Sequence, residues 1–199
     1  MNEILQVKPK SKMNKFLQAV RNSMIRDGQL GGYVHDTAMA QYLPPTFIHL
    51  VTGTWSMAAG QTAGTVAMHL AAAAQTVTVN IPIEIPSNAV SANNKGSYLK
   101  SIEVDFWIGV VAMTSITPTL NLITRNADGS APTVAAQTIT YLPAQATLIG
   151  TGYHKMVNTL TTPIWLANTQ YALLSLSIVQ PATATLDLLS AVVNFTARM

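Results

Sequence analysis

Two stretches of the chain alternate apolar and polar residues with a period of two, and this feature constrains the fold most. In residues 76–86, every second residue is Val or Ile. From Ile102 to Ile108 the apolar positions alternate with Glu103, Asp105 and Trp107. This period predicts strands with one face on a core, over 76–86 and 98–112. Pro82 has no amide hydrogen, so the first strand should lie at a sheet edge or donate nothing at that point.

Shorter strand patterns and turn signals fill most of the remaining sequence. The Asn126–Gly129 segment reads Asn-Ala-Asp-Gly and predicts a hairpin turn. We expect further strands in seven places, near residues 46–55, 64–70, 117–125, 133–142, 153–160, 170–180 and 184–197. The chain is therefore expected to be all-β: a jelly-roll-like antiparallel β-sandwich of about eight or nine strands.

The basic residues are concentrated at the start of the chain. Residues 1–26 carry six basic residues against Glu3, whereas residues 27–199 carry five basic and seven acidic residues. Apolar residues recur at helical spacing over 12–27, with Ser11 placed to cap a helix and Gly28 placed to end it. We expect a basic arm over 1–32 containing an amphipathic helix, 12–27, followed by a sandwich domain over 33–199.

The apolar stripe of this helix must pack against something. Its candidate partners are its own sandwich, a neighbouring subunit, or nucleic acid or a membrane surface, which basic amphipathic helices also contact. The arm residues expected to make partner contacts are Lys8, Lys10, Lys12, Lys15, Phe16, Leu17, Val20, Arg21, Met24 and Arg26.

Composition excludes several classes of protein and favours an assembly. The chain has no cysteine, so disulfides and thiolate metal sites are excluded. No apolar run is long enough to span a membrane, and no signal peptide is expected at the start. Charged residues make up 10%, against about 25% in typical soluble domains. A surface so poor in charge suits close packing between copies, so we expect a homo-oligomer.

Few residue patterns point to catalysis. Glu103 and Asp105 share a strand face, with Glu84 a candidate neighbour, and paired carboxylates can hydrolyse glycosides. The same residues are also typical of a solvated strand face. Asp105, Asp128 and Asp187 are candidates for a calcium site, but there is no dense ligand run. No spacing of the four histidines matches a metal or triad motif. We therefore expect no enzyme activity and no cofactor.

The three tryptophans raise the alternative of a carbohydrate-binding module. Trp55, Trp107 and Trp165 all lie in predicted strands or next to them. Trp107 has the parity of Glu103 and Asp105, so it should be partly exposed. Tryptophan in strands more often fills a core or an interface. A lectin-like or adhesin sandwich is therefore the second hypothesis for function.

Two segments of the second half resemble jelly-roll proteins among phage and metagenomic virion components, including capsid and decoration proteins. They are 96–106, Gly-Ser-Tyr-Leu-Lys-Ser-Ile-Glu-Val-Asp-Phe, with its continuation at 117–120, and 165–173, followed by 184–191. The resemblance implies a jelly roll and a role in building a particle, and it assigns no functional residue. A basic arm before a jelly roll also resembles viral coat proteins, although this arm is short. The first hypothesis is therefore a virion subunit that contacts itself and other virion proteins.

Overall fold

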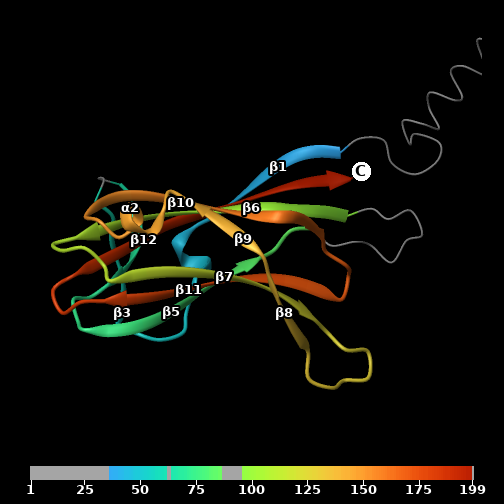
Figure 1. Cartoon of the computed structure of the whole chain (residues 1–199), viewed down its shortest axis with the longest axis horizontal. Coiled ribbons are helices and arrows are strands. Elements are labelled where there is room, and N and C mark those ends of the chain that lie inside the picture. Colours follow the sequence, from blue (N-terminus) through green and yellow to red (C-terminus); the bar gives the residue numbers. More distant parts are fainter. Residues whose placement is uncertain (1–35, 62–63, 87–95, 199) are drawn as a thin grey trace, which may run out of the picture.

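A computed structural model describes residues 36–61, 64–86 and 96–198. The arm over 1–32, its predicted helix 12–27 and its ten predicted contact residues lie outside these ranges. Within them the chain forms two antiparallel sheets packed face to face (Figure 1). The expected all-β sandwich is therefore confirmed. No helix in the described residues is long and apolar enough to cross a membrane.

The first sheet has seven strands and is ordered β3-β4-β12-β6-β10-β9, with β1 also paired to β12. Its strands are β1 (Asp36–Leu43), β3 (Trp55–Ala59), β4 (Val66–Leu70), β6 (Gly96–Gly109), β9 (Ile139–Leu142), β10 (Gly152–Trp165) and β12 (Thr185–Arg198). The second sheet has five strands, ordered β2-β5-β11-β7-β8. These strands are β2 (His49–Leu50), β5 (Gln75–Ile83), β7 (Ser115–Thr124), β8 (Thr133–Gln137) and β11 (Gln170–Gln180).

Two short helical turns connect strands: η1 (Pro45–Phe47) and α2 (Gln145–Leu148). The predicted hairpin at Asn126–Gly129 is confirmed, because β7 pairs with β8 across it. Gly129 has a φ of +77°, and Ser130 donates its backbone N–H to Asp128 Oδ1 at 2.9 Å. A side-chain hydrogen bond with Ser130, followed by this backbone bond, lowers the pKa of Asp128 below its usual value.

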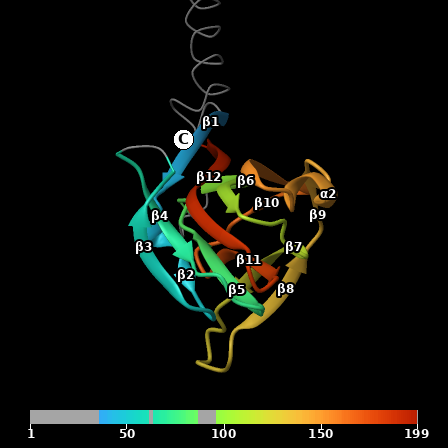
Figure 2. The same cartoon turned by 90° about the vertical axis from the view of Figure 1, so that its left-hand side faces the viewer.

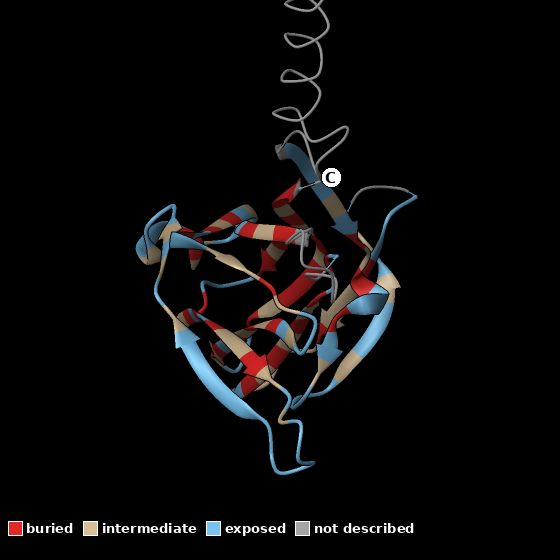
Figure 3. Ribbon diagram, turned by 90° about the vertical axis from the view of Figure 1, so that its right-hand side faces the viewer, coloured by how far each residue is buried: buried red, intermediate tan, exposed pale blue. Residues whose placement is uncertain are grey.

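The core lies between the sheets and is built by the alternation seen in the sequence. On β5, Val77, Val79 and Ile81 are fully buried. On β6, Ile102, Val104, Phe106 and Ile108 face them, while the intervening residues lie on the outer face of the seven-stranded sheet. Figure 3 shows buried positions alternating with less buried ones along these central strands.

Pro82 lies in a strand that is not itself at the edge of its sheet. β5 is flanked by β11 and by β2, but β2 pairs only with Val79 and Asn80. The β2 side of β5 is therefore open at Pro82, where a missing amide hydrogen costs no ladder bond. Of the two predicted alternatives, the one that holds is that the strand donates nothing at Pro82.

Several predicted strand boundaries were wrong. The segment 46–55 contains the end of η1, the two-residue β2 and the first residue of β3, and the predicted strand 133–142 is divided into β8 and β9. Strands β1 and β3 were not predicted. β1 lacks strict alternation, and it forms because β12 offers it a free edge along residues 191–198.

Candidate functional site

A gap in the backbone ladder of the seven-stranded sheet creates a pocket on its outer face. β1 pairs with β12 from Arg198 back to Ala191, and β4 pairs with the same edge of β12 only from Leu186 to Leu188. Neither strand pairs with Leu189 or Ser190, where β12 also has a β-bulge against β6. β1 stops because Pro44 and Pro45 follow Leu43, and proline cannot donate to a ladder.

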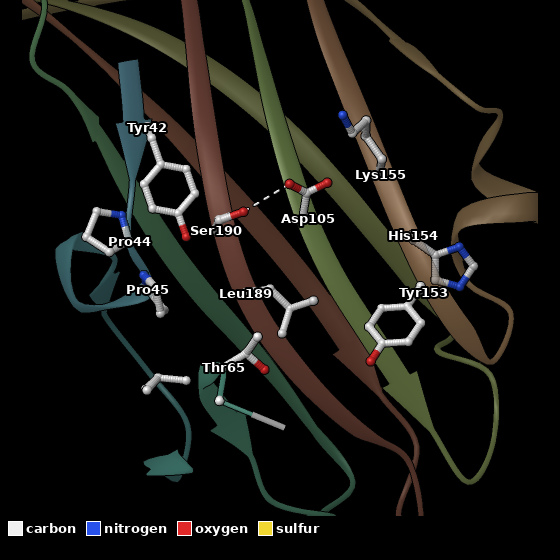
Figure 4. Close-up of a pocket in the computed structure, with 12 residues that line it drawn as sticks. Tyr42, Pro44, Pro45, Thr65, Asp105, Tyr153, His154, Lys155, Leu189 and Ser190 are labelled. Atoms are coloured by element: carbon white, nitrogen blue, oxygen red, sulfur yellow. Dashed lines mark hydrogen bonds between the residues drawn. The ribbon is translucent and has the colours of Figure 1, made fainter. Parts of the chain in front are cut away.

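The pocket above this gap has a volume of about 760 Å³ and draws on five strands and their loops. This volume lies in the range that holds small ligands, about 300–1,000 Å³. Figure 4 shows Tyr42 and Tyr153 on opposite sides, with Leu189, Ser190 and Asp105 between them. Pro44, Pro45 and the β3–β4 loop residues Gly64 and Thr65 complete one wall.

The two tyrosines are among the most exposed large side chains of the described residues. Tyr42 is 62% exposed and Tyr153 is 57% exposed. Tyr42 is paired with Val192 of β12, and Tyr153 with Trp107 of β6, so both belong to the outer face of the sheet. The pocket thus offers apolar ring surface on two sides.

The floor between the rings is polar. Ser190 Oγ donates to Asp105 Oδ2 at 2.9 Å (Figure 4). This bond engages one of the two carboxylate oxygens of Asp105, a residue that lines the pocket. Lys155 lies directly opposite Asp105 in the β6–β10 ladder and also lines the pocket. The floor therefore combines a carboxylate oxygen that can accept with an ammonium group that can donate.

Lys155 is held in place by a second carboxylate. Its Nζ donates to Glu103 Oε2 at 2.9 Å, and Asn194 donates to Glu103 Oε1 at 2.9 Å. The Lys155 bond is the largest cause that lowers the pKa of Glu103 below 4.5. The same bond, followed by the charges of Glu103 and Asp105, raises the pKa of Lys155 above 10.5. Both groups are therefore charged at neutral pH.

His154 also borders the pocket, but its ring is engaged elsewhere. Its Nε2 lies 2.6 Å from the carbonyl oxygen of Gly150, and its ring lies 5.4 Å from that of Phe106. We assign it a structural role at the edge of the core.

A second polar cluster lies next to the pocket on the same face. Asp187, 1% exposed, accepts from Gln61 Nε2 at 3.0 Å and is 2.6 Å from His69 Nδ1. This cluster anchors β12 to β4 and to the loop that leads into the pocket wall. It was not predicted, because the sequence separates His69 from Asp187 by more than a hundred residues.

The predicted carboxylate sites are not assembled. Glu103 and Asp105 share the outer face of β6, as predicted, but Glu84 follows β5 in the other sheet. Asp128 lies in the β7–β8 loop, apart from Asp105 and Asp187. The described residues contain no group of three or more side chains suited to hold a metal ion.

None of the three tryptophans lines the pocket, although Trp107 is the cross-strand neighbour of Tyr153. Trp55 packs against the core and donates from Nε1 to the Thr52 carbonyl at 2.7 Å. Trp165 makes an edge-to-face contact with Tyr98, with ring centroids 4.4 Å apart. Trp107 is half-buried on the outer face, which confirms its predicted parity. The aromatic residues of the pocket are instead Tyr42 and Tyr153. Tyr153 could have been identified from the sequence because it lies two residues before Lys155 and therefore shares the solvent-exposed face of the same strand.

No family model matches the chain, and no curated protein matches it. Among solved structures, it is similar to the CBM22-1–GH10 modules of a Clostridium thermocellum xylanase complexed with xylohexaose. That match has a TM-score of 0.41 and 6% identity over 80% of this chain, but only 28% of the xylanase chain. A low-affinity xylan-binding module from Roseburia intestinalis matches with a TM-score of 0.35 and 12% identity, over 79% of this chain and 96% of that one.

The enzymatically active domain of bacteriophage CBA120 tailspike protein 4 matches with a TM-score of 0.33 and 6% identity. This match covers 82% of this chain and 19% of the tailspike chain.

Proposed function

We propose that this chain is a non-catalytic carbohydrate-binding protein whose site is the pocket between Tyr42 and Tyr153. The observation that carries the proposal is the pairing of two exposed tyrosine rings with a polar floor. A pyranose ring has C–H groups with partial positive charge and hydroxyl groups around its rim. The faces of aromatic rings carry partial negative charge, so the rings of Tyr42 and Tyr153 can stack on the C–H groups. The hydroxyl groups can form hydrogen bonds with the polar floor of Asp105, Ser190 and Lys155.

Charge in the pocket favours an uncharged ligand. The positive charge of Lys155 is balanced by the carboxylate of Glu103, 2.9 Å away. The carboxylate of Asp105 therefore has no positive charge of its own to balance it on the floor of the pocket. A phosphate or carboxylate ligand would meet this negative charge, whereas a sugar hydroxyl can donate to it. The same reasoning disfavours nucleic acid at this site.

The tyrosines set the scale of the expected affinity. Covering one face of each ring would remove on the order of 60 Å² per ring from water, worth about 1.5 kcal/mol. Loss of one ring should therefore weaken binding about tenfold.

The test is a glycan array followed by calorimetric titration of the best neutral ligand. The wild-type chain is compared with Tyr42→Ala, Tyr153→Ala and the double variant. Tyr171→Ala is the matched control, because Tyr171 is 44% exposed on β11, outside the pocket. We expect both single variants to weaken binding, the double variant to abolish it and the control to bind as wild type. Binding that survives in the double variant, or no bound glycan at all, would contradict the proposal.

A structural role in a virion is the second candidate function. What supports it is the small number of charges on the body of the chain, with five basic and seven acidic residues in 27–199. A charge-poor surface packs against copies or other coat subunits at a low desolvation cost. Light scattering of the full chain and of a variant lacking residues 1–30 tests whether the arm anchors such an assembly. Identical monomers at every concentration would count against it.

A further inference from the structure

One side of the sandwich is closed by a single extended segment whose outer edge is free. β8 is the last strand of the five-stranded sheet, and β9 is the last strand of the seven-stranded sheet. Only Thr138 separates them, and its carbonyl accepts from the Thr161 backbone N–H at 3.1 Å. The inner edge is therefore bonded to β7 and then to β10, while no described strand pairs with the outer edge (Figure 2).

This edge lacks the features that usually protect edge strands. Residues 131–142 contain no charged residue, and no proline interrupts β8 or β9. Thr133 to Ala136 are all exposed, as the exposed colour of this strand in Figure 3 shows. Val134 is 63% exposed and Leu142 is 70% exposed. Natural proteins commonly place lysine, proline or a bulge at such an edge, because its free N–H and C=O groups pair readily with another chain.

The edges on the other side of the sandwich differ. β2 has only two residues, and β3 has Trp55 packed against the core. β8, in contrast, has four consecutive residues exposed on both faces, so it extends beyond the packed layers. It can therefore be approached without displacing any described segment.

We infer that the β8 edge pairs antiparallel with β8 of a second copy of this chain, about a two-fold axis. Such an axis places β8 against β8 of the second copy, so a charged residue near the centre would face the same charge across the interface. The uncharged sequence of β8 removes this penalty. An unrelated extended peptide would need side-chain pockets beside the edge for specificity, and both faces of β8 are open to solvent. Pairing would join two five-stranded sheets into one continuous sheet.

The experiment is analytical ultracentrifugation of the full chain over a dilution series. We expect a concentration-dependent dimer of the wild type. Ala135 lies in the middle of β8, so Ala135→Lys and Ala135→Glu should each weaken dimerisation about tenfold or more by like-charge repulsion. An equimolar mixture of the two variants should restore a dimer. This rescue also shows that neither variant has lost its fold.

Ala59→Lys is the control, because Ala59 is an exposed alanine on β3, the edge strand at the opposite end of the seven-stranded sheet. It should dimerise as wild type, and so should the Tyr42→Ala, Tyr153→Ala double variant. A monomeric wild type, an undiminished Ala135→Lys dimer, a mixture that stays monomeric or a dimer lost with Ala59→Lys would each overturn the inference. None of these outcomes bears on glycan binding.

Discussion

Asp187 should be among the most sensitive polar residues of the described chain. It is 1% exposed, and each of its carboxylate oxygens has one side-chain partner, His69 Nδ1 at 2.6 Å and Gln61 Nε2 at 3.0 Å. Hydrogen bonds to a charged group contribute about 1.5–3 kcal/mol each. Asp187→Ala removes both and leaves two donors without their acceptor, so it should lower the free energy of unfolding by about 3–5 kcal/mol.

A double-mutant cycle with His69 separates this bond from the general effect of the substitution. Asp187→Asn keeps the volume but loses one acceptor, and should cost about 1.5–3 kcal/mol. The coupling energy between Asp187→Ala and His69→Ala should be of the same order, because each substitution removes the same bond. The control is Asp128→Ala, since Asp128 is exposed in the β7–β8 loop.

The assay is urea unfolding followed by tryptophan fluorescence, with free energies extrapolated to water. The control should change stability much less than Asp187→Ala. A cost below about 1 kcal/mol for Asp187→Ala, or no coupling to His69, would refute the reasoning that this buried carboxylate anchors β12 to β4.

Two further predictions concern pH and backbone conformation. The lowered pKa of Glu103 means that its bond to Lys155 stabilises the fold above the unfolded carboxyl's pKa of about 4.5, and that this contribution disappears as pH falls through the folded pKa. The wild type should therefore be more stable than Glu103→Gln at neutral pH, and this difference should shrink in acid unfolding titrations. A difference that grows on acidification would contradict this sign. Gly53 has a φ of +98°, and a Cβ there would lie 2.6 Å from Val77 Cγ1, whereas Gly129 has a φ of +77° and open space. Gly129→Ala should cost about 1–2 kcal/mol from backbone strain alone, and Gly53→Ala more. Equal unfolding free energies for the two variants would show that the contact with Val77 is relieved without cost.

The sequence predicts those strands whose two faces differ in environment. β5 and β6 alternate strictly because one face of each lies on the core, and both were predicted close to their observed positions. β1 and β3 were not predicted, since much of each strand is exposed and little separates their faces in polarity. Their pairing depends on the free edges of β12 and β4, which no local pattern reveals.

The pocket was beyond sequence reasoning for a related reason. Tyr42 and Tyr153 face one another only because β1, β12, β6 and β10 are neighbours in that order. Tryptophan was the better aromatic candidate by residue type. However, Trp55 and Trp165 have partners of their own, in the Thr52 carbonyl and the Tyr98 ring. Residue type pointed to aromatic side chains, and strand order decided which aromatic residues line the pocket.

The central position of β12 has a consequence for biosynthesis. β12 pairs with β1, β4 and β6, so it joins segments that leave the ribosome long before it does. Leu43 pairs with Ala191 and Asp36 with Arg198, which makes these contacts very distant in sequence. Such contacts form slowly. The seven-stranded sheet can be completed only after residue 198 has emerged from the ribosome. During translation, the edges of β1 and β4 that pair with β12 are therefore unpaired. In this interval the unpaired edges are open to pairing with the strands of another chain.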